Sequence, residues 1–252
     1  MYKILANTVF LGKDIHFMTE CHSTNDLAME KIKRKEVSEG SIVITQSQTK
    51  GRGQRGSQWW TEPGKNLTFS LILRPVFLKP HKQFELSKIV CLALWETLSA
   101  LDSQIKIKWP NDLFHQSQGK ICGVLIENII NQQSVEFSIM GIGLNVNQLD
   151  FPFPGVSSLK KISGEEIDLN HLLSELVSKI EKWYLLLKRG DYKFIHGQYL
   201  GQLLYFQEWA SYNDGETFEG KIIGVNEEGK IIVEKRTGEQ VAYGIKEVKL
   251  LA

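Results

Sequence analysis

The feature that most constrains the fold is a change of hydrophobic periodicity near residue 204. Upstream, residues 83–101 and 169–187 repeat apolar side chains at helical spacing, which predicts two long amphipathic helices. Around these helices, runs rich in β-branched and aromatic residues predict strands at residues 41–46, 67–73, 105–109, 120–130 and 135–146. Downstream, residues 217–225, 230–234 and 240–243 alternate with turn sequences, which favours hairpins. We therefore expect an α+β protein with two domains, residues 1–204 and 205–252.

Another helix is expected to begin at Ser23. The Ser23 hydroxyl can cap the first turn, and Asp26 fits both a capping box and the positive end of a helix dipole. Apolar residues then recur on one face as far as Ile32. Residues 192–204 favour a further helix, so the first domain is expected to combine strands with several helices.

The balance of acidic and basic residues indicates whether the protein can bind duplex DNA. The sequence has 252 residues with 30 Lys and Arg, 29 Asp and Glu, and a formal net charge of +1. A broad phosphate-binding surface for duplex DNA needs an excess of basic residues, which this balance does not provide. The sequence therefore argues against duplex DNA as a partner, although a local basic loop is compatible with it.

Cysteine usage and the absence of long apolar runs indicate the compartment. Cys21, Cys91 and Cys122 are far apart and form no C-x-x-C pair, which favours reduced thiols over a zinc site or a disulfide framework. Residues 1–10 lack the pattern of a signal peptide. No stretch approaches the roughly 18–20 apolar residues that a membrane span needs. We therefore expect a cytoplasmic protein with no membrane partner.

Residues 51–59, GRGQRGSQW, form the most informative loop. Its three glycines allow the backbone to approach a ligand closely. Arg52 and Arg55 offer donors for carboxylate or phosphate oxygens, and Trp59 offers a flat face for a base. The loop matches neither a dinucleotide fingerprint nor a Walker A sequence. It suits an anionic, partly aromatic ligand such as a nucleotide, while a flexible basic surface loop explains the same composition.

A second informative stretch is KWPND at residues 108–112. Proline ends the expected strand, so that Asn111 and Asp112 are displayed where it stops. A hairpin between this strand and the next would bring Asp112 close to Lys120, which can act as a point charge on a carboxylate or phosphate. A simple Pro-Asn-Asp turn with an exposed, unpaired Lys120 is the alternative.

The third stretch is GIGLNVN at residues 141–147. Gly141 and Gly143 inside a strand leave room for a bulky group against the backbone, and Asn145 can supply a polar contact. A β-bulge is the alternative explanation for the two glycines. Elsewhere the six histidines are scattered, and neither an H-E-x-x-H nor a G-x-S-x-G motif occurs, which argues against a zinc hydrolase and a serine hydrolase.

Together these stretches resemble the catalytic domain of biotin–protein ligases. That family has a Ser-Thr-Asn entry, a Gly-Arg-Gly-x-x-Gly loop ending in Trp, a Lys-Trp-Pro-Asn-Asp strand end, a Lys-x-x-Gly-x-Leu-x-Glu strand and a Gly-x-Gly-x-Asn strand. The same motifs stand here, in the same order, at residues 23–25, 51–59, 108–112, 120–127 and 141–145. The resemblance is strong over residues 15–200 and weak over the tail. Five motifs in one order are far more specific than any one of them, and they outweigh the alternatives given above.

The resemblance implies a fold and a set of partners. The fold would be a mixed sheet flanked by helices, related to class II aminoacyl-tRNA synthetase catalytic domains, followed by a small SH3-like β barrel. The partner would be a biotin carboxyl carrier protein or carboxylase subunit. Many relatives carry an N-terminal DNA-binding domain, but this sequence reaches its Ser-Thr-Asn motif by residue 23, so we expect no repressor activity. Relatives occur as monomers and as homodimers, which leaves the oligomeric state open.

The implied reaction uses biotin and ATP as substrates, with Mg²⁺ on the phosphates. Biotin would first be activated as biotinyl-5′-AMP and then transferred to a lysine of the carrier. Residues matching the family's catalytic positions are Lys120 and Arg52, which would neutralise charge, and Asp112, which would orient the incoming lysine or Mg²⁺. No dedicated metal site is predicted.

The remaining site residues are assigned by their matching motif positions. Those implied for biotin are Ser23, Thr24, Asn25, Gln48, Arg52, Gly53, Gln54, Lys120, Gly123, Gly141 and Gly143. Those implied for the nucleotide are Arg52, Arg55, Trp59, Asn111, Lys120 and Asn145. Gln54 departs from those relatives that have Arg at this position, which removes one charge beside the acyl-adenylate. The loop at residues 49–60 is expected to order on ligand binding and to shield the reactive anhydride from water.

Two other functions remain as rivals. A lipoyl or octanoyl transferase shares this general fold, but the Gly-Arg-Gly-x-x-Gly loop and the Lys-Trp-Pro-Asn-Asp stretch speak against it. A nucleic-acid reader using Arg52, Arg55 and Trp59 is the other, and it would show steep salt dependence of oligonucleotide binding.

Overall fold

The computed structural model describes residues 7–251, apart from the side chain of Arg55. The strands are β1 (Ile15–Cys21), β2 (Ile42–Gln48), β3 (Leu67–Leu73), β4 (Ile105–Lys108), β5 (Asp112–His115), β6 (Gly119–Ile130), β7 (Val135–Leu144), β8 (Trp209–Asn213), β9 (Thr217–Val225), β10 (Ile231–Lys235), β11 (Gln240–Tyr243) and β12 (Lys249–Leu250). The α-helices are α1 (Thr24–Lys33), α2 (Phe84–Leu98), α3 (Leu159–Ser163), α4 (Leu169–Arg189) and α5 (Tyr192–Gly201). Short 3₁₀ helices lie at η1 (Gln54–Gly56) and η2 (Pro80–Lys82).

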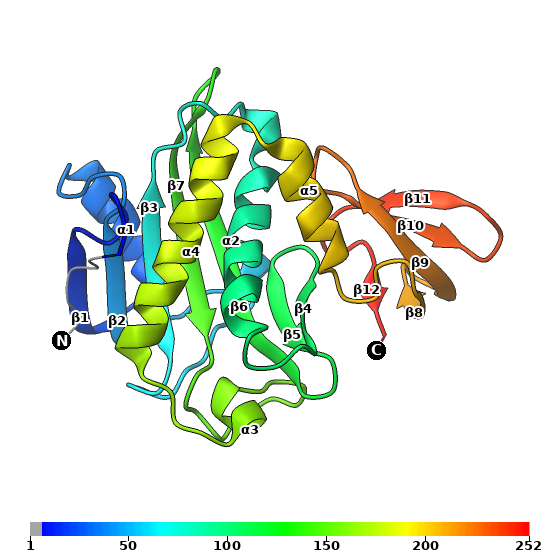
Figure 1. Ribbon diagram of the computed structural model, residues 1–252, viewed down its shortest axis with the longest axis horizontal. Coiled ribbons are helices and arrows are strands. Elements are labelled where there is room, and N and C mark those ends of the chain that lie inside the picture. The colour runs from blue at the N-terminus through cyan, green and yellow to red at the C-terminus, as the bar shows by residue number, and fades with distance from the viewer. Residues whose placement is uncertain (1–6, 252) are drawn as a thin grey trace.

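The main sheet is mixed. Within the described residues it has seven strands in the order β1-β2-β3-β7-β6-β5-β4. β1 and β2 are parallel, and every other pair of neighbours is antiparallel. Helices α2 and α4 pack side by side over one face, whereas α1 packs against β2, β3 and β7 (Figure 1). Since α1 has only 10 residues, it leaves much of its face of the sheet uncovered.

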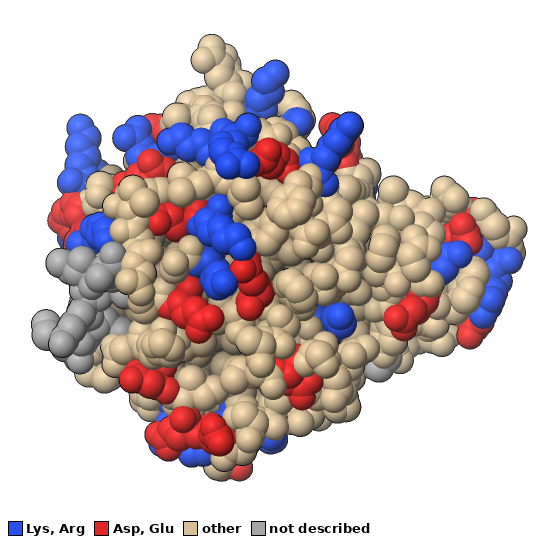
Figure 2. Space-filling model, viewed as in Figure 1, with Lys and Arg blue, Asp and Glu red and all other residues tan. Residues whose placement is uncertain are grey.

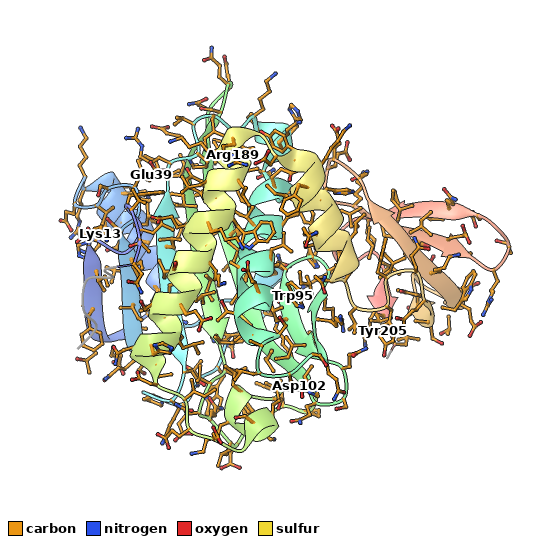
Figure 3. All side chains as sticks on the ribbon, viewed as in Figure 1. Lys13, Glu39, Trp95, Asp102, Arg189 and Tyr205 are labelled. Carbon is orange, nitrogen blue, oxygen red and sulfur yellow. The ribbon has the colours of Figure 1, made fainter. Side chains whose placement is uncertain are left out.

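The main core lies between the sheet and α2 and α4, where side chains fill the space (Figure 3). Leu67, Phe69, Leu71 and Leu73 alternate along β3 onto this face and are fully buried. Helix α4 is amphipathic; Asp168 caps its N-terminus by accepting hydrogen bonds from the N–H groups of residues 170 and 171. Burial of alternate strand residues against an amphipathic helix is what fixes the orientation of the sheet.

A second, antiparallel sheet follows at residues 209–250, with strand order β11-β10-β9-β8-β12 (Figure 1). Contacts at Gly229 tie it to the first part of the chain. Trp109 donates its indole N–H to the carbonyl of Gly229 at 2.9 Å. The backbone of Ile107 pairs with residues 202–204, which precede this sheet. Phe84 packs closely against Gly229. The β-rich tail is therefore joined to the end of the main sheet that carries β4.

The mixed α+β architecture and the separate C-terminal sheet confirm the expectations from the sequence. The periodicity did not predict β1, β5, β8, β12 or α3, because these elements are short or lie at sheet edges where alternation is weak. In the described part of the chain, no helix is both long enough and apolar enough to cross a membrane. Acidic and basic side chains intermingle over the face that carries α2 and α4 (Figure 2).

Glu96 on α2 links the two helices that cover the main sheet. Its carboxylate accepts hydrogen bonds from Lys179, Lys182 and the indole of Trp183 on α4, at 2.8–2.9 Å. Burial acts to raise the pKa of Glu96, but these hydrogen bonds outweigh burial and hold the pKa below its usual value.

We expect Glu96→Gln to lower the free energy of unfolding at neutral pH by about 1 kcal/mol. Because the folded-state pKa is depressed, this stabilisation is complete above the ordinary carboxyl pKa and is lost as the pH falls through the folded-state value. Urea unfolding of both proteins at successively lower pH should therefore show the difference shrinking. Glu175→Gln, at an exposed position of α4, is the matched control. A difference that does not vary with pH would contradict this account.

Candidate functional site

The uncovered face of the sheet carries a cavity of about 360 Å³. Its floor is a row of residues that lie opposite one another on neighbouring strands. Thr68 of β3 pairs with Gly143 of β7, Gly143 pairs with Gly123 of β6, and Gly123 pairs with Asp112 of β5. Residues opposite each other in a sheet project to the same face, so these four residues share one surface. The two central glycines make a trough between the Thr68 and Asp112 side chains.

Segments far apart in the sequence form the walls of this cavity. Most of the predicted site residues line it, namely Ser23, Thr24, Asn25, Gln48, Arg52, Gly53, Gln54, Trp59, Asp112, Lys120, Gly123, Gly141, Gly143 and Asn145. Residues that the sequence did not single out complete it, among them Ser57, Gln58, Trp60, Thr68, Val124, Leu125, Ile142, Phe151, Pro152, Phe153, Val156 and Lys246. Lys246 comes from the loop before β12, so the C-terminal part of the chain reaches the cavity.

The glycines of β7 allow two side chains to lie directly on the sheet. A Cβ at Gly143 would overlap the Trp59 indole, and a Cβ at Gly123 would lie 3.0 Å from its Cζ3. A Cβ at Gly141 would overlap the Asn25 carboxamide. The β6–β7 register runs without a break through Gly141 and Gly143, so the bulge explanation is wrong and the close-approach explanation is right. The groups that approach are Asn25 and Trp59.

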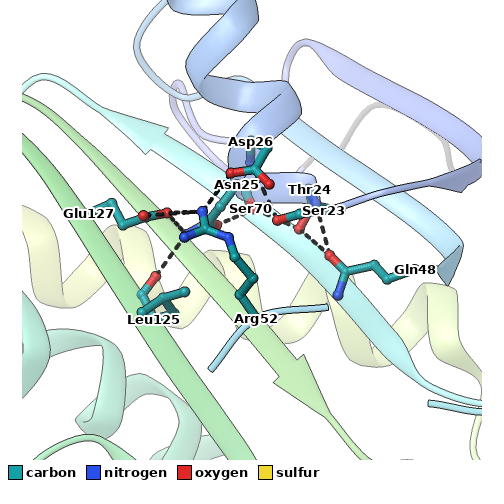
Figure 4. Close-up of polar contacts among 9 residues, drawn as sticks. All are labelled: Ser23, Thr24, Asn25, Asp26, Gln48, Arg52, Ser70, Leu125 and Glu127. Atoms are coloured by element: carbon teal, nitrogen blue, oxygen red, sulfur yellow. Dashed lines mark hydrogen bonds and ion pairs between the residues drawn. The ribbon is translucent and has the colours of Figure 1, made fainter. Parts of the chain in front are cut away.

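Asn25, at the start of α1, lies in a polar network beneath the cavity (Figure 4). Its amide donates to the Leu125 carbonyl at 3.2 Å and to the Glu127 carboxylate at 2.7 Å. Its carbonyl oxygen accepts from the hydroxyl of the fully buried Ser70 at 2.6 Å. Both N–H donors of Asn25 are therefore used inside the protein, and its remaining capacity is as an acceptor.

Gln48 and Ser23 keep donors that the protein does not use. The Gln48 carbonyl accepts from the Thr24 backbone N–H at 2.8 Å and from the Thr24 hydroxyl at 3.2 Å. The Ser23 hydroxyl accepts from the backbone N–H of Asp26 at 3.4 Å, as the predicted cap does. Within the described residues, neither the Gln48 amide N–H groups nor the Ser23 O–H donates to the protein. They therefore offer a ligand hydrogen-bond donors beside the Asn25 acceptor.

Arg52 is held by two carboxylates of different elements (Figure 4). One of its terminal nitrogens lies 2.5 Å from Asp26 of α1 and 3.1 Å from both oxygens of Glu127 of β6. Burial alone would lower the pKa of Arg52, but the neighbouring Glu127 and Asp26 carboxylates raise it. The guanidinium therefore stays charged at the cavity wall.

Lys120 and Asp112 form an ion pair with 2.6 Å between the ammonium nitrogen and a carboxylate oxygen. Asp112 and Lys120 come together as expected, but through a hairpin of β6 with β5, a strand that the sequence did not predict, and the unpaired-lysine alternative is wrong. A break in the β5–β6 register leaves Ile121 as an extra residue between Lys120 and Cys122. Such a bulge reverses the alternation, and it turns Lys120 to the face that carries Asp112. The Lys120 ammonium also lies 5.7 Å from the centre of the Trp59 ring.

Lys108 lies opposite Asp112 on β4. Burial is the main reason why the pKa of Lys108 is lowered, with repulsion from Lys120 and Lys249 adding to it and Asp112 opposing it. Asp112 is therefore the acidic member of a cluster whose other charges are lysines.

Of the predicted nucleotide contacts Asn111 and Asn145, only Asn145 lines the cavity. Asn111 is 3% exposed and does not line the cavity, because its amide donates to the carbonyl of Val124 and ties β5 to β6. Asn145 lines the cavity, and its amide donates to the carbonyl of Ser157 at 3.1 Å. Among the residues that the structure describes, its buried carbonyl oxygen has no hydrogen-bond partner, and neither has the buried Trp59 indole N–H. The predicted Arg55 side chain lies outside the described part of the structure.

The cavity offers little for a resident metal ion. Among the described residues, no group of three or more His, Cys, Asp or Glu side chains could hold one. Asp112 is the one carboxylate among the lining residues, and Lys120 already pairs with it. This donor set fits a metal ion that arrives bound to phosphates, because Mg²⁺ in such sites takes one or two protein carboxylates.

The contact between Trp59 and Gly143 gives a prediction about the loop. We expect Gly143→Ala to lower the free energy of unfolding by about 1–3 kcal/mol, because the added methyl group overlaps the indole. In a Trp59→Ala background the same substitution should change the stability far less. Urea unfolding of the four proteins measures both effects. Gly197→Ala is the control, since a Cβ at this position meets no neighbouring atom. An equal penalty in both backgrounds would show that Trp59 is not the obstacle.

The chain is similar to known proteins over nearly its whole length. Residues 18–145 match the model of the biotin/lipoate A/B protein ligase family. The chain is 31% identical to the bifunctional ligase/repressor BirA of Bacillus spizizenii, covering 94% of this chain and 74% of that protein. It is 27% identical to the biotin–[acetyl-CoA-carboxylase] ligase of Paracoccus denitrificans, covering 79% of this chain and 86% of that protein.

Solved structures share the fold as well. The structure of a biotin protein ligase from Aquifex aeolicus in complex with biotin and ATP superposes with a TM-score of 0.77 at 27% identity. The match covers 94% of this chain and 98% of that chain. The fold of most of this chain therefore has an experimentally determined counterpart.

Proposed function

This chain belongs to the biotin/lipoate A/B protein ligase family, and from that premise we propose that it is a biotin–protein ligase. It forms biotinyl-5′-AMP from biotin and ATP, and then transfers biotin to a lysine of a carboxylase carrier domain. The names of the Paracoccus and Aquifex relatives support biotin and ATP as its substrates.

The observation that carries the proposal is the combination of uncharged and cationic groups around one cavity. Gln48 and Ser23 offer donors, and Asn25 offers an acceptor, which suits a cyclic urea with one carbonyl and two N–H groups. Arg52 and Lys120 line the same cavity and suit the carboxylate and phosphates. Such an arrangement distinguishes biotin strongly from an analogue without the urea, because the analogue would leave buried polar groups unpaired.

In the first step, a biotin carboxylate oxygen attacks the α-phosphorus of ATP. The bond from this phosphorus to the bridging oxygen of the β-phosphate breaks, and pyrophosphate leaves with the electron pair. Both reactants are anionic, so the enzyme must bring like charges together and stabilise the additional charge of the transition state. Lys120 and Arg52 supply positive charge for this purpose, and Mg²⁺ enters with the ATP phosphates as part of the substrate.

In the second step, the carrier lysine attacks the carbonyl carbon of the mixed anhydride. An amide bond forms, AMP leaves with the electrons of the carbon–oxygen bond, and the amine loses a proton. Asp112 is the acidic lining residue and is our candidate for orienting that amine. We assign Trp59 to covering the adenylate, because it lies across the floor of the cavity and its indole N–H has no partner among the described residues. The two steps need no protein nucleophile.

We extend the proposal to the organisation of the chain. Residues 1–204 form the catalytic domain, of the type related to class II aminoacyl-tRNA synthetases, and residues 205–252 form an SH3-like domain. The reach of Lys246 into the cavity supports a role for the second domain in binding ATP or the carrier. The near balance of 30 basic and 29 acidic residues supports a protein partner rather than DNA.

The proposal predicts that the purified protein converts biotin and α-labelled ATP into labelled biotinyl-AMP when Mg²⁺ is present. Thin-layer chromatography of the products measures this, and chelation of Mg²⁺ should abolish the signal because the phosphates then lose their counter-charge. Lipoate is the parallel substrate. Product with lipoate alone would move the chain to the lipoyl branch of the family, and no product with either acid would overturn the proposal.

A second prediction concerns Lys120. We expect Lys120→Ala to lower the rate of adenylate formation by about 10²–10³-fold, because it removes positive charge from the reacting oxygens. The fold should persist, since the lysine is partly exposed and lies at the surface of the cavity. Single-turnover formation of biotinyl-AMP measures the effect. Lys160→Ala, which breaks a surface pair with Glu166, is the control. Near-normal turnover of Lys120→Ala would remove this residue from the mechanism.

A further inference from the structure

Asp26 and Glu127 are two acids with no assigned role, and both contact the same nitrogen of Arg52 (Figure 4). Asp26 lies in the first turn of α1, Glu127 lies on β6, and Arg52 belongs to the loop that covers the cavity. The loop is therefore attached to two separate elements through one side chain. Neither acid lines the cavity, whereas Arg52 does.

The geometry leaves most of the guanidinium for a ligand. A guanidinium has five N–H donors, and the two acids take those of a single terminal nitrogen. Within the described residues, the other two nitrogens of Arg52 make no hydrogen bond to the protein. Fixing one nitrogen sets the plane of the guanidinium, so the three remaining N–H groups have defined directions.

Glu127 also reaches the uncharged side of the cavity. One of its oxygens accepts from the Asn25 amide at 2.7 Å as well as from Arg52 at 3.1 Å. Asn25 in turn accepts from the buried Ser70, which also contacts Thr24 at 2.7 Å. A single carboxylate thus sets the orientation of the Asn25 amide and of the Arg52 guanidinium.

Two acids next to one arginine leave a net negative charge beside a cavity built for anions. A merely structural tie between the loop and the sheet would need only one carboxylate, and the second one repels an anionic ligand. The second carboxylate is therefore better explained by a positioning role. In that role, the benefit of orienting the remaining N–H donors of Arg52 outweighs the unfavourable charge.

We propose that Glu127 and Asp26 are a positioning pair that docks Arg52, and with it the loop at residues 49–60, over the cavity. Glu127 alone also orients Asn25, so it couples the site for the uncharged end of the acid substrate to the site for its anionic end. The proposal rests on the proposed ligase function for its kinetic consequences, but the docking of the loop does not depend on it.

The two acids differ in their contacts, which provides the kinetic test. Asp26→Asn removes a partner of Arg52 alone and keeps the backbone N–H that Ser23 caps. It should lower kcat/KM for ATP in adenylate formation by about tenfold and weaken biotin binding, measured by calorimetry without ATP, only through the donor for the biotin carboxylate. Glu127→Gln should lower kcat/KM for ATP similarly and weaken biotin binding more than Asp26→Asn does, because Asn25 also loses its charged acceptor.

Matched controls and a second background separate positioning from general stability. Glu30→Gln on α1 and Glu136→Gln on β7 remove acids that do not contact Arg52 or Asn25, and should change neither parameter. In an Arg52→Ala background, Asp26→Asn should have no further effect on kcat/KM for ATP, because its partner is gone. An equal tenfold loss in both backgrounds would overturn the proposal.

Hydrogen exchange of the protein without ligands tests the docking independently of activity. The backbone N–H groups of Gly53 and Trp59 are bonded to the carbonyls of Ser57 and Gly51 within the loop. In Asp26→Asn and Glu127→Gln, amides of residues 49–60 should exchange about tenfold faster than in the parent protein, while β3 and β7 keep their protection. Unchanged exchange in the loop of both variants would overturn the proposal. If the parent protein forms no biotinyl-AMP, the ligase function fails, and the exchange result still decides whether the acids dock the loop.

Discussion

The constraint on which the site depends is the absence of side chains at the centre of the sheet. Gly123 and Gly143 lie opposite each other between Thr68 and Asp112, so the floor of the cavity is bare backbone over two strands. Any larger residue there would meet the Trp59 indole or the Lys120 side chain. These side chains can lie so close to the sheet only because both positions are glycine. The loop at residues 49–60, helix α1 and the bulge on β6 all border this trough.

The orientation of the polar side chains at the cavity follows from the requirement that buried polar groups be hydrogen-bonded. Ser70 is fully buried beneath the cavity, and with Glu127 and the Leu125 carbonyl it fixes the orientation of the Asn25 carboxamide. Because both N–H donors of Asn25 are used there, Asn25 offers a ligand only an acceptor, while Gln48 and Ser23 offer the donors. The hydrogen-bonding pattern of the cavity thus follows from groups that the ligand never touches. The hydrogen-bonding specificity of the cavity therefore depends on residues that lie beneath its lining.

Much of this arrangement was accessible from the sequence, and the rest has identifiable reasons for being missed. The expected start of a strand at Lys120 predicted that Asp112 and Lys120 lie close together, and the capping pattern predicted the start of α1. The bulge at Ile121 is invisible in the sequence because it depends on register between two strands. Asn111 was expected at the nucleotide from its matching position in the family's motif, yet its amide donates to the Val124 carbonyl. Ser70 and Lys246 carried no local signal, since only the tertiary fold brings them to the cavity.

The groups of the cavity also explain why positioning, and not covalent catalysis, is the chemistry it suits. Cys122 is a nucleophilic side chain near the site, but it is fully buried, and burial raises its pKa, with the charge of Asp112 adding to the effect. A thiol in such surroundings stays protonated and unreactive. The cations, in contrast, are each held by carboxylates: Arg52 by Asp26 and Glu127, and Lys120 by Asp112. Charges held in place before a ligand arrives need little reorganisation when charge develops on it, and this is the condition under which electrostatic stabilisation is most effective.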